Sequence, residues 1–316
     1  MRTSLAVGLA AALSACATQP PPRAQGCVEA PAPQASVRRP SAIHPVLPTL
    51  RLENLRFQDL AECATGTCAV DGASPSAPTS PASQDGATTL PPAMAWLQVI
   101  RPGAAVAIPR RANTDLLGVA LVGTVSLERP GAPQVAPVQA GAWTAFLVPD
   151  GDAVLRASGD APAAAILVTA SGPSPAAERP RDVQLRDLVA AQDLSWAQGS
   201  VHARIAFEAP LSPRASLGVL VASDDAPVAE HAHDGAWELL AAVSAAGRLH
   251  VPAQRVPGVA QPLEARDRTV TAGSIVYVPA GVRHAWIPDG THPLIAVQVY
   301  SPAGPEQRFR GLSAAP

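Results

Sequence analysis

Three histidines and one glutamate in the last third of the sequence have the types and spacing of a metal site. His231 and His233 are separated by one residue, Glu238 follows after four more, and His284 comes later, behind a Pro-x-Gly turn. In a β-strand, residues two apart point to the same face, so His231 and His233 are expected to enter one cavity. The sharp turn at Gly281 would direct His284 into that cavity from a neighbouring strand. Three imidazoles and a carboxylate that converge can bind a divalent transition metal, and the sequence leaves Fe, Mn, Ni, Cu and Zn open.

These residues lie in two segments that resemble the two motifs of the cupin family. The second segment, residues 273–284, matches the family motif, and the departure comes at Pro288, where cupins usually have Asn. The first is looser, because Asp225 stands in place of the leading glycine and Gly247 comes two residues late. The resemblance implies a jelly-roll barrel in which the three histidines and the glutamate bind the metal.

Further residues are candidates to orient the metal ligands or to line a substrate pocket. They flank the ligands or lie on strands expected to line the barrel: Trp237, His250, Arg283, Trp286, Gln298 and Tyr300. The alternative is that the tryptophans belong to the core at the barrel end and that the arginine is exposed. The remaining histidines, and equally His250, fit no ligand spacing and are expected to be surface residues or hydrogen-bonded core residues: His44, His202 and His292.

The pattern of apolar runs predicts an all-β fold of two tandem cupin-like barrels. Runs of four to eight apolar residues are bounded by Gly, Pro and Asp, which is typical of sandwiches and barrels. Pro-rich breaks separate two folded blocks, over residues 94–172 and 180–305. Two segments, Leu55–Cys63 and Leu185–Leu194, are predicted as helices.

The two blocks also resemble each other, which indicates an internal repeat. Aligning them places Ile108, Arg110, Asp115 and Val154, in that order, opposite the four ligand residues of the second block. The first barrel is therefore expected to be degenerate, without metal ligands, and to pack sheet to sheet against the second as a scaffold. A salt bridge between Asp115 and Arg110 is expected at its former metal position.

Composition excludes one class of function. The chain of 316 residues has a formal net charge of −2 and no basic run, so it offers no electrostatic surface for DNA or RNA. It also has 35 prolines and few aromatic residues, which argues against a helical bundle.

The N-terminus resembles a bacterial lipoprotein signal, with a short apolar run that ends at Cys16. This resemblance implies that Cys16 is lipidated, that lipid alone ties the protein to a membrane, and that it faces the periplasm from the outer membrane. In that oxidising compartment Cys63 and Cys68 are expected to form a disulfide, and Cys27 has no assigned role. The expected organisation is a signal peptide over residues 1–15, a Pro-rich tether over 16–48, a short island and linker over 49–93, the barrels over 94–172 and 180–305, and a tail over 306–316.

Three functions remain open at this stage. The first is an enzyme that acts on a small molecule, as an oxygenase on Fe(II) or as an isomerase or lyase on Mn(II), Ni(II) or Zn(II). The second is an envelope protein that binds or senses a small molecule without turnover, and the third is a structural envelope protein. The cupin resemblance also allows a homodimer formed through sheet edges.

Overall fold

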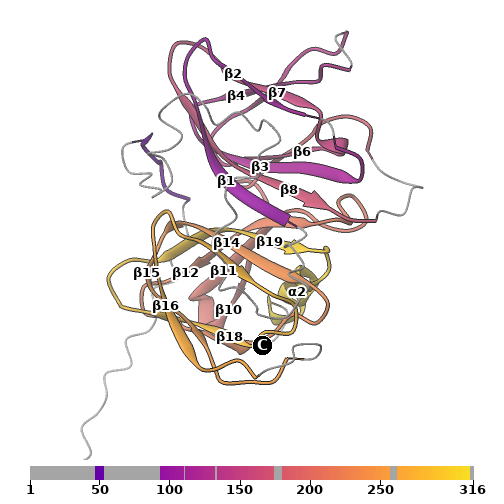
Figure 1. Ribbon diagram of the computed structural model, residues 1–316. Coiled ribbons are helices and arrows are strands. Elements are labelled where there is room, and N and C mark those ends of the chain that lie inside the picture. Colours follow the sequence, from indigo (N-terminus) through magenta and orange to yellow (C-terminus); the bar gives the residue numbers. More distant parts are fainter. Residues whose placement is uncertain are drawn as a thin grey trace, which may run out of the picture. The chain divides into compact units, whose positions relative to one another are not determined.

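The protein is described here from a computed structural model that covers residues 47–52, 93–109, 111–131, 134–173, 180–256 and 262–313. The regular elements in these ranges are almost all β-strands. They form four sheets, two from each half of the chain (Figure 1). The predicted all-β fold with two tandem barrels is therefore confirmed.

The first barrel consists of a five-stranded sheet, in the order β1-β8-β3-β6-β9, and a four-stranded sheet, in the order β2-β7-β4-β5. Its elements are β1 (Ala93–Ile100), β2 (Ala105–Ile108), β3 (Thr114–Val122), β4 (Val125–Glu128), β5 (Val138–Ala140), β6 (Thr144–Val148), the 3-10 helix η2 (Pro149–Gly151), β7 (Ala153–Ala157), β8 (Ala163–Ser171) and β9 (Gln184–Asp187). Its core is aliphatic apart from Phe146.

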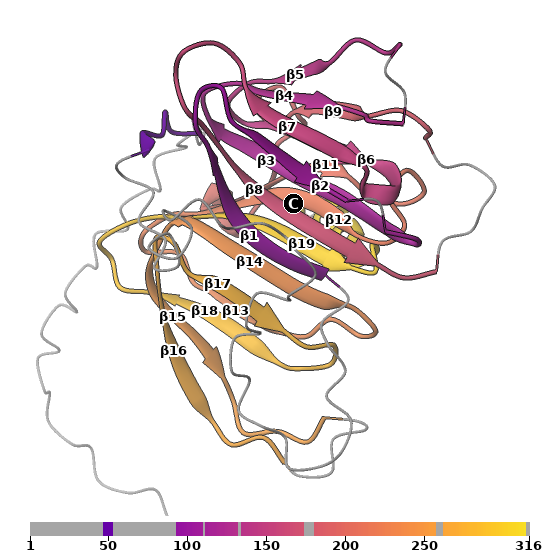
Figure 2. The same ribbon diagram turned by 45° about the horizontal axis from the view of Figure 1, so that its top comes forward.

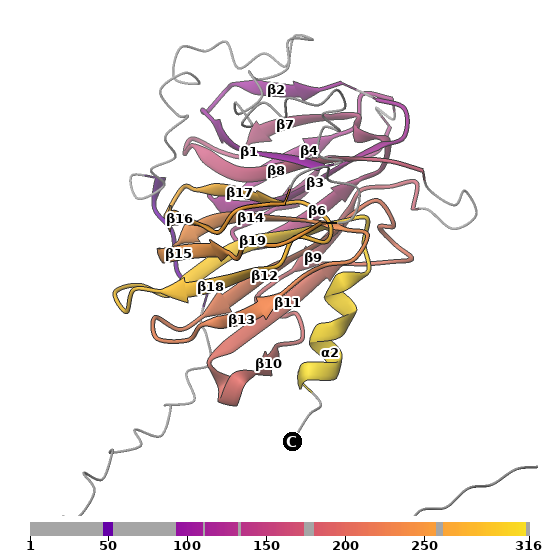
Figure 3. The same cartoon turned by 60° about the horizontal axis from the view of Figure 1, so that its bottom comes forward.

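The second barrel consists of a six-stranded sheet, in the order β10-β11-β12-β19-β14-β17, and a four-stranded sheet, in the order β13-β18-β15-β16. Its strands are β10 (Leu194–Trp196), β11 (Val201–Phe207), β12 (Ser216–Ala222), β13 (Val228–His231), β14 (Trp237–Ser244), β15 (Ala246–Val251), β16 (Arg266–Thr271), β17 (Ile275–Val278), β18 (His284–Pro288) and β19 (Leu294–Ser301). Its short helices are η3 (Ala197–Gly199), η4 (Pro305–Gln307) and α2 (Arg308–Ser313). Figure 3 shows α2 next to β10.

The larger sheets of the two barrels pack against each other through one shared apolar cluster. On β3, Leu117 and Val119 belong to this cluster, and on β14 Leu239 and Ala241 do. Figure 2 shows β1, β3 and β8 of the first barrel beside β14 and β19 of the second. The predicted sheet-to-sheet pairing of the barrels is confirmed.

Strand alternation gives each of these sheets two buried faces. Leu239 and Ala241 face the other barrel, whereas Leu240 and Ala242 belong to the core of their own barrel. Strands buried on both faces read as continuous apolar runs rather than as alternating ones. This double burial explains the uninterrupted run of apolar residues from Leu239 to Val243.

The structure differs from three expectations from the sequence. The segment Leu185–Leu194 is not a helix: it contains β9, a turn and the first residue of β10. Because β9 pairs with β6, the sheet of the first barrel extends beyond the expected start of the second block at residue 180. The expected tail over residues 306–316 contributes most of η4 and α2, whose Phe309 is buried.

Several other predictions concern residues outside the described ranges. They are the signal peptide, the lipidated Cys16, the Cys63–Cys68 disulfide, the helix over Leu55–Cys63, and the roles of Cys27, His44 and Arg110.

The strand pairing of each barrel shows which residues are equivalent. It changes the alignment that was made from the sequence by one residue at two positions. In the second barrel His231 pairs with His284 and Glu238 pairs with Val278. In the first barrel the matching pairs are Ile108 with Ala153 and Leu116 with Val148. The residues equivalent to Glu238 and His284 are therefore Leu116 and Ala153, not Asp115 and Val154. All three equivalent positions in the described residues of the first barrel are apolar and buried: Ile108, Leu116 and Ala153.

Asp115 joins the two barrels through a buried ion pair with Arg214. Its Oδ1 lies 2.8 Å from Nη1 of Arg214, and both side chains are 2% exposed. Arg214 also donates from Nε to the carbonyl of Gly172, 2.8 Å away. Removing one partner of a buried ion pair is strongly destabilising, because the charge that remains stays buried without a counter-charge.

We therefore expect Arg214→Met to lower the free energy of unfolding by about 3 kcal/mol, measured by urea denaturation. The matched control is Arg156→Met, which removes an exposed ion pair to Glu128 and should change stability by less than about 1 kcal/mol. The double variant Asp115→Asn with Arg214→Met should recover part of the loss. If Arg214→Met and Arg156→Met lowered the free energy of unfolding by the same small amount, the importance of the buried pair would be contradicted.

Candidate metal centre

Three elements of the second barrel bring the four predicted ligand residues together. His231 ends β13 and pairs with His284, the first residue of β18. His233 lies in the turn that follows β13, and Glu238 is the second residue of β14. Because Leu239 faces the other barrel, alternation turns Glu238 into its own barrel.

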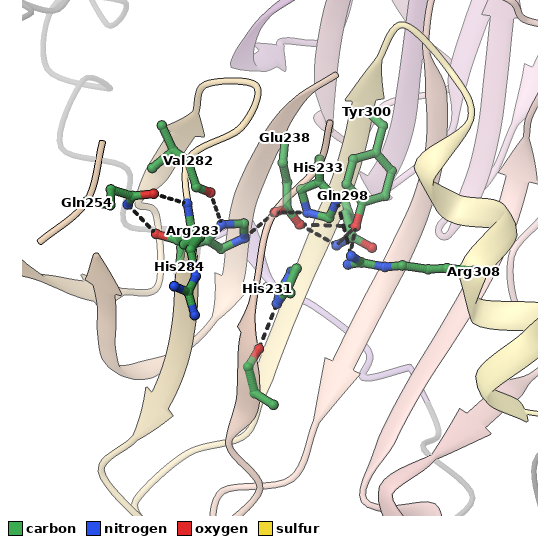
Figure 4. A network of polar contacts seen from close by, with 11 residues as sticks. His231, His233, Glu238, Gln254, Val282, Arg283, His284, Gln298, Tyr300 and Arg308 are labelled. Carbon is green, nitrogen blue, oxygen red and sulfur yellow. Dashed lines mark hydrogen bonds and ion pairs between the residues drawn. The ribbon is translucent and has the colours of Figure 1, made fainter. Parts of the chain in front are cut away.

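The ligand atoms of His231, His233, Glu238 and His284 all lie within 4.8 Å of one another. Oε2 of Glu238 lies 3.0 Å from Nε2 of His233 and 2.7 Å from Nε2 of His284 (Figure 4). His233, Glu238 and His284 are buried, and His231 is half-buried. In the described residues this is the one group of His, Cys, Asp or Glu side chains that is arranged to hold a metal ion.

The hydrogen-bond partners assign the protonation of each imidazole. His284 lies 2.9 Å from the carbonyl of Val282 through Nδ1 and 2.7 Å from Glu238 through Nε2, so both of its nitrogens donate and it is an imidazolium. His231 donates from Nδ1 to the carbonyl of Ala229, 2.7 Å away, which leaves a lone pair on Nε2.

The electrostatics of the site agree with these assignments. Burial, followed by the charge of His284, lowers the pKa of His231 to about 4, so its imidazole is neutral at pH 7. Burial alone would raise the pKa of Glu238, but the hydrogen bonds from His233 and His284 hold it well below its usual range. Burial also opposes a charged His284, yet the hydrogen bond to Glu238 and the charge of that carboxylate raise the pKa of His284 overall.

The second carboxylate oxygen of Glu238 is held by two residues that were predicted as pocket candidates. Gln298 donates from Nε2 to Oε1 of Glu238 at 2.6 Å, and the Tyr300 hydroxyl donates to the same oxygen at 3.3 Å. Gln298 also donates to the Tyr300 hydroxyl at 2.8 Å. Burial raises the pKa of Tyr300 well above its usual value, so its hydroxyl keeps its proton. These two residues orient Glu238 with Oε2 toward the imidazoles.

The other four pocket candidates do not line the site. His250 faces outward, because its neighbours Leu249 and Val251 face the core, and its Nδ1 bonds Asp267 at 2.7 Å. Arg283 is exposed and pairs with Glu230. Trp237 precedes Glu238 on β14, so alternation directs it to the opposite face.

Trp286 is a core residue, as the alternative interpretation held. Its ring lies against Gly247, where an added Cβ would come within 2.8 Å of the ring and 2.5 Å of the Ile287 carbonyl. The position of Gly247 therefore follows from the packing of Trp286 across the paired strands β15 and β18.

His202 was also expected to lie outside the site. Its two ring nitrogens form hydrogen bonds with Asp193, at 2.9 Å, and with the Gly199 carbonyl, at 2.8 Å.

Arg308 reaches the site from α2, and the motif spacing did not predict it. Its Nη1 lies 3.2 Å from Nδ1 of His233, and its Nη2 lies 3.3 Å from the Tyr300 hydroxyl. Arg308 and His233 line an open cavity of about 390 Å³, whose other walls are formed by residues 232–236 and 302–305. A signal for this arrangement was Phe309, the one aromatic residue in the sequence after Tyr300.

The residues present fit a divalent transition metal. Nε2 of His231 is buried and has no hydrogen-bond partner among the described residues, although its lone pair points toward the other ligands. A buried polar atom without a partner is costly unless something binds it. Three imidazole nitrogens and one carboxylate oxygen are a donor set that such ions accept.

Comparisons with solved structures identify the fold. The chain is similar to an oxalate decarboxylase studied for its substrate binding mode and a reaction specificity switch, with a TM-score of 0.54, 14% identity, and coverage of 68% of this chain and 70% of that one. It is also similar to Bacillus subtilis oxalate decarboxylase studied for its Mn(II) centres, with a TM-score of 0.55, 14% identity and the same coverage. The chain therefore has the bicupin fold.

No protein-family model matches the sequence, and no curated protein does. The cupin resemblance seen in the sequence thus agrees with the structure, while the reaction has to be argued from the site.

Metal binding should release about one proton per ion below the raised pKa of His284, because the imidazolium must become neutral to act as a ligand. The apparent affinity should rise about tenfold per pH unit in that range and level off above it. Calorimetric titration with Zn(II), in buffers of different ionisation enthalpy, measures the protons released. An affinity that does not change between pH 5.5 and 8 would contradict the assigned imidazolium.

Proposed function

We propose that this protein is a metal-dependent enzyme that acts on a small organic acid. The observation that carries the proposal is the buried set of three imidazoles and one carboxylate, next to a cavity that has a guanidinium in its wall. A purely structural barrel would not need these four costly polar groups in its interior.

The ligand residues leave room for a substrate on the metal. An ion that accepts six ligands and takes four from the protein keeps positions for substrate oxygens, and when bound it would act as a Lewis acid on them. Arg308 supplies a cation at the cavity, and guanidinium groups bind carboxylates through paired hydrogen bonds. These two features together favour a carboxylate substrate.

The similar solved structures support a particular reaction. They are oxalate decarboxylases, and one was studied for its Mn(II) centres. The oxygenase and isomerase reactions expected from the sequence also begin with a substrate bound through oxygen. We prefer decarboxylation because the similar structures are decarboxylases and the cation in the cavity suits a carboxylate substrate. In that reaction a C–C bond breaks, CO₂ leaves, and a proton takes the place of CO₂ on the remaining carbon. Asp234 lines the same cavity and is exposed, so in this proposal it would relay the proton from solvent.

A second candidate is a protein that binds a small anion without turnover. The polar side chains next to the ligands, Gln298 and Tyr300, are both engaged with Glu238. This leaves Asp234 as the one carboxylate lining the described cavity apart from the metal ligands. Such a scarcity of acid and base groups is what a binding protein would have.

An activity assay separates the two candidates. Protein reconstituted with Mn(II) or Fe(II) should release CO₂ from oxalate or from another small carboxylic acid in a panel, and His284→Ala should reduce the rate to background. His250→Ala is the matched control, because His250 lies outside the site, and it should retain the activity. Saturable binding of an acid without CO₂ release favours the binding protein, and neither binding nor turnover would exclude both.

The proposal includes a location in the bacterial envelope, held by lipid on Cys16, at the outer membrane and facing the periplasm. This part is supported by the resemblance of the N-terminus to a lipoprotein signal. Among the described residues, no helix has the length and apolar character needed to cross a membrane. A homodimer formed through sheet edges stays a prediction, which light scattering of the purified protein tests.

Substituting Cys16→Ser should release the protein from the membrane fraction of the expressing cells, because the acylated cysteine is the expected anchor. Cys27→Ser is the matched control and should leave the protein with the membranes. Fractionation and immunoblotting measure both. Membrane association of the Cys16→Ser protein equal to that of the wild type would contradict the lipid anchor.

A further inference from the structure

Arg308 reaches the candidate metal centre from a helix outside the barrel strands. Helix α2 is held in place by Phe309, which is buried and stacks on Trp196 with ring centroids 5.0 Å apart. The guanidinium of Arg308 lies over the Tyr300 ring, 5.9 Å from its centroid, and points at His233 (Figure 4).

The contact between Arg308 and His233 assigns the proton on that imidazole. A guanidinium has donors and no acceptor, so Nδ1 of His233, 3.2 Å from Nη1, must accept with its lone pair. The single proton of the neutral ring is then on Nε2, which donates to Glu238 at 3.0 Å. This is the opposite arrangement from His231, whose Nε2 carries the lone pair.

A metal bound by Nε2 of His233 requires the other tautomer. The lone pair must then be on Nε2 and the proton on Nδ1, where it would point at the N–H of Arg308. Two donors that face each other at hydrogen-bond distance repel. The contact between Arg308 and His233 and the ligation of a metal by Nε2 of His233 are therefore mutually exclusive.

The surroundings of Arg308 allow it to leave. Its Nε is buried and has no hydrogen-bond partner in the described part of the chain, so the guanidinium is only partly satisfied where it lies. Arg308 lines the cavity of about 390 Å³, and Asp234 lines the same cavity. A long, flexible arginine side chain can turn into this space while Phe309 keeps the helix anchored.

We propose that Arg308 is a positioning residue that controls metal loading: it holds His233 in the tautomer that cannot ligate, and metal binding displaces its guanidinium into the cavity. This inference rests on the metal site of the proposed function. It adds that metal binding frees the guanidinium, which already lines the cavity, from its contact with His233, so the metal and an anionic substrate would bind in that order.

The first test compares Zn(II) affinities of the full-length chain, stripped with a chelator, for wild type, Arg308→Met and Arg310→Gln. Arg308→Met should bind Zn(II) roughly 10- to 100-fold more tightly, the factor that one charge-assisted hydrogen bond contributes. Arg310→Gln is the matched control on the same helix, since Arg310 contacts Glu208 and Gln192 and not the site, and it should bind like the wild type. Zn(II) bound elsewhere on the chain is subtracted with His284→Ala.

The second test reads the tautomer directly, by ¹⁵N NMR of the histidine and arginine side chains. In the wild type, the proton of His233 should lie on Nε2 before Zn(II) is added and on Nδ1 afterwards, and the Arg308 Nε–H signal should shift. A role of Arg308 in packing alone would leave the Arg308 Nε–H signal unchanged when Zn(II) binds. This measurement needs no variant, so it decides the question even if Arg308→Met does not fold.

An affinity of Arg308→Met equal to or weaker than that of the wild type would overturn the role of Arg308, and so would an unshifted Arg308 signal on Zn(II) loading. In both cases the wild type still binds Zn(II), and the proposed function stands. A wild-type chain that binds no Zn(II) at this site would overturn both proposals.

Discussion

The carboxylate of Glu238 is the constraint on which the site depends. It is 2% exposed, inside a barrel whose core is otherwise apolar, and its pKa is held well below its usual range. A buried charge of this kind is tolerated when every lone pair has a donor or a cation. Here His233 and His284 contact one oxygen, and Gln298 and Tyr300 contact the other. The pairing of β14 with β19 brings Gln298 and Tyr300 to Glu238, and the pairing of β13 with β18 places the histidines on its other side.

The second barrel supplies all four ligand residues, and the first barrel packs against the strand that carries Glu238. One face of β14 carries Glu238 inward, while Leu239 and Ala241 on its other face pack against the first barrel. The strand that carries the carboxylate is therefore buried on both faces and cannot shift easily. In its own core the first barrel has apolar residues where the second has ligands: Ile108, Leu116 and Ala153. Its contribution to the second barrel is the apolar face of its larger sheet, with Leu117 and Val119.

The fold and the four ligands could be predicted from the sequence because both depend on local patterns. Apolar runs between turn residues predict strands, and alternation along β13 and β14 places His231 and Glu238. The predicted helix over Leu185–Leu194 was wrong because β9 is stabilised by its pairing with β6, a tertiary contact that overrides local preference. Asp115 could not be assigned, since its partner Arg214 is 99 residues away. Arg308 was missed for the same reason: contact between α2 and the barrel depends on packing of Phe309 with Trp196, which no motif encodes.

The most direct test of the account is the metal content of the protein purified without added metal or chelator, measured by elemental analysis. The account predicts about one equivalent of a divalent transition metal per chain, lost in the variant His231→Ala with His233→Ala and retained in His292→Ala, which alters an exposed histidine outside the site. The double variant should keep its β-sheet circular dichroism, because neither histidine belongs to the apolar core of the barrel. A stoichiometric metal in the double variant, or no metal in the wild type even after reconstitution, would contradict the assignment of the site.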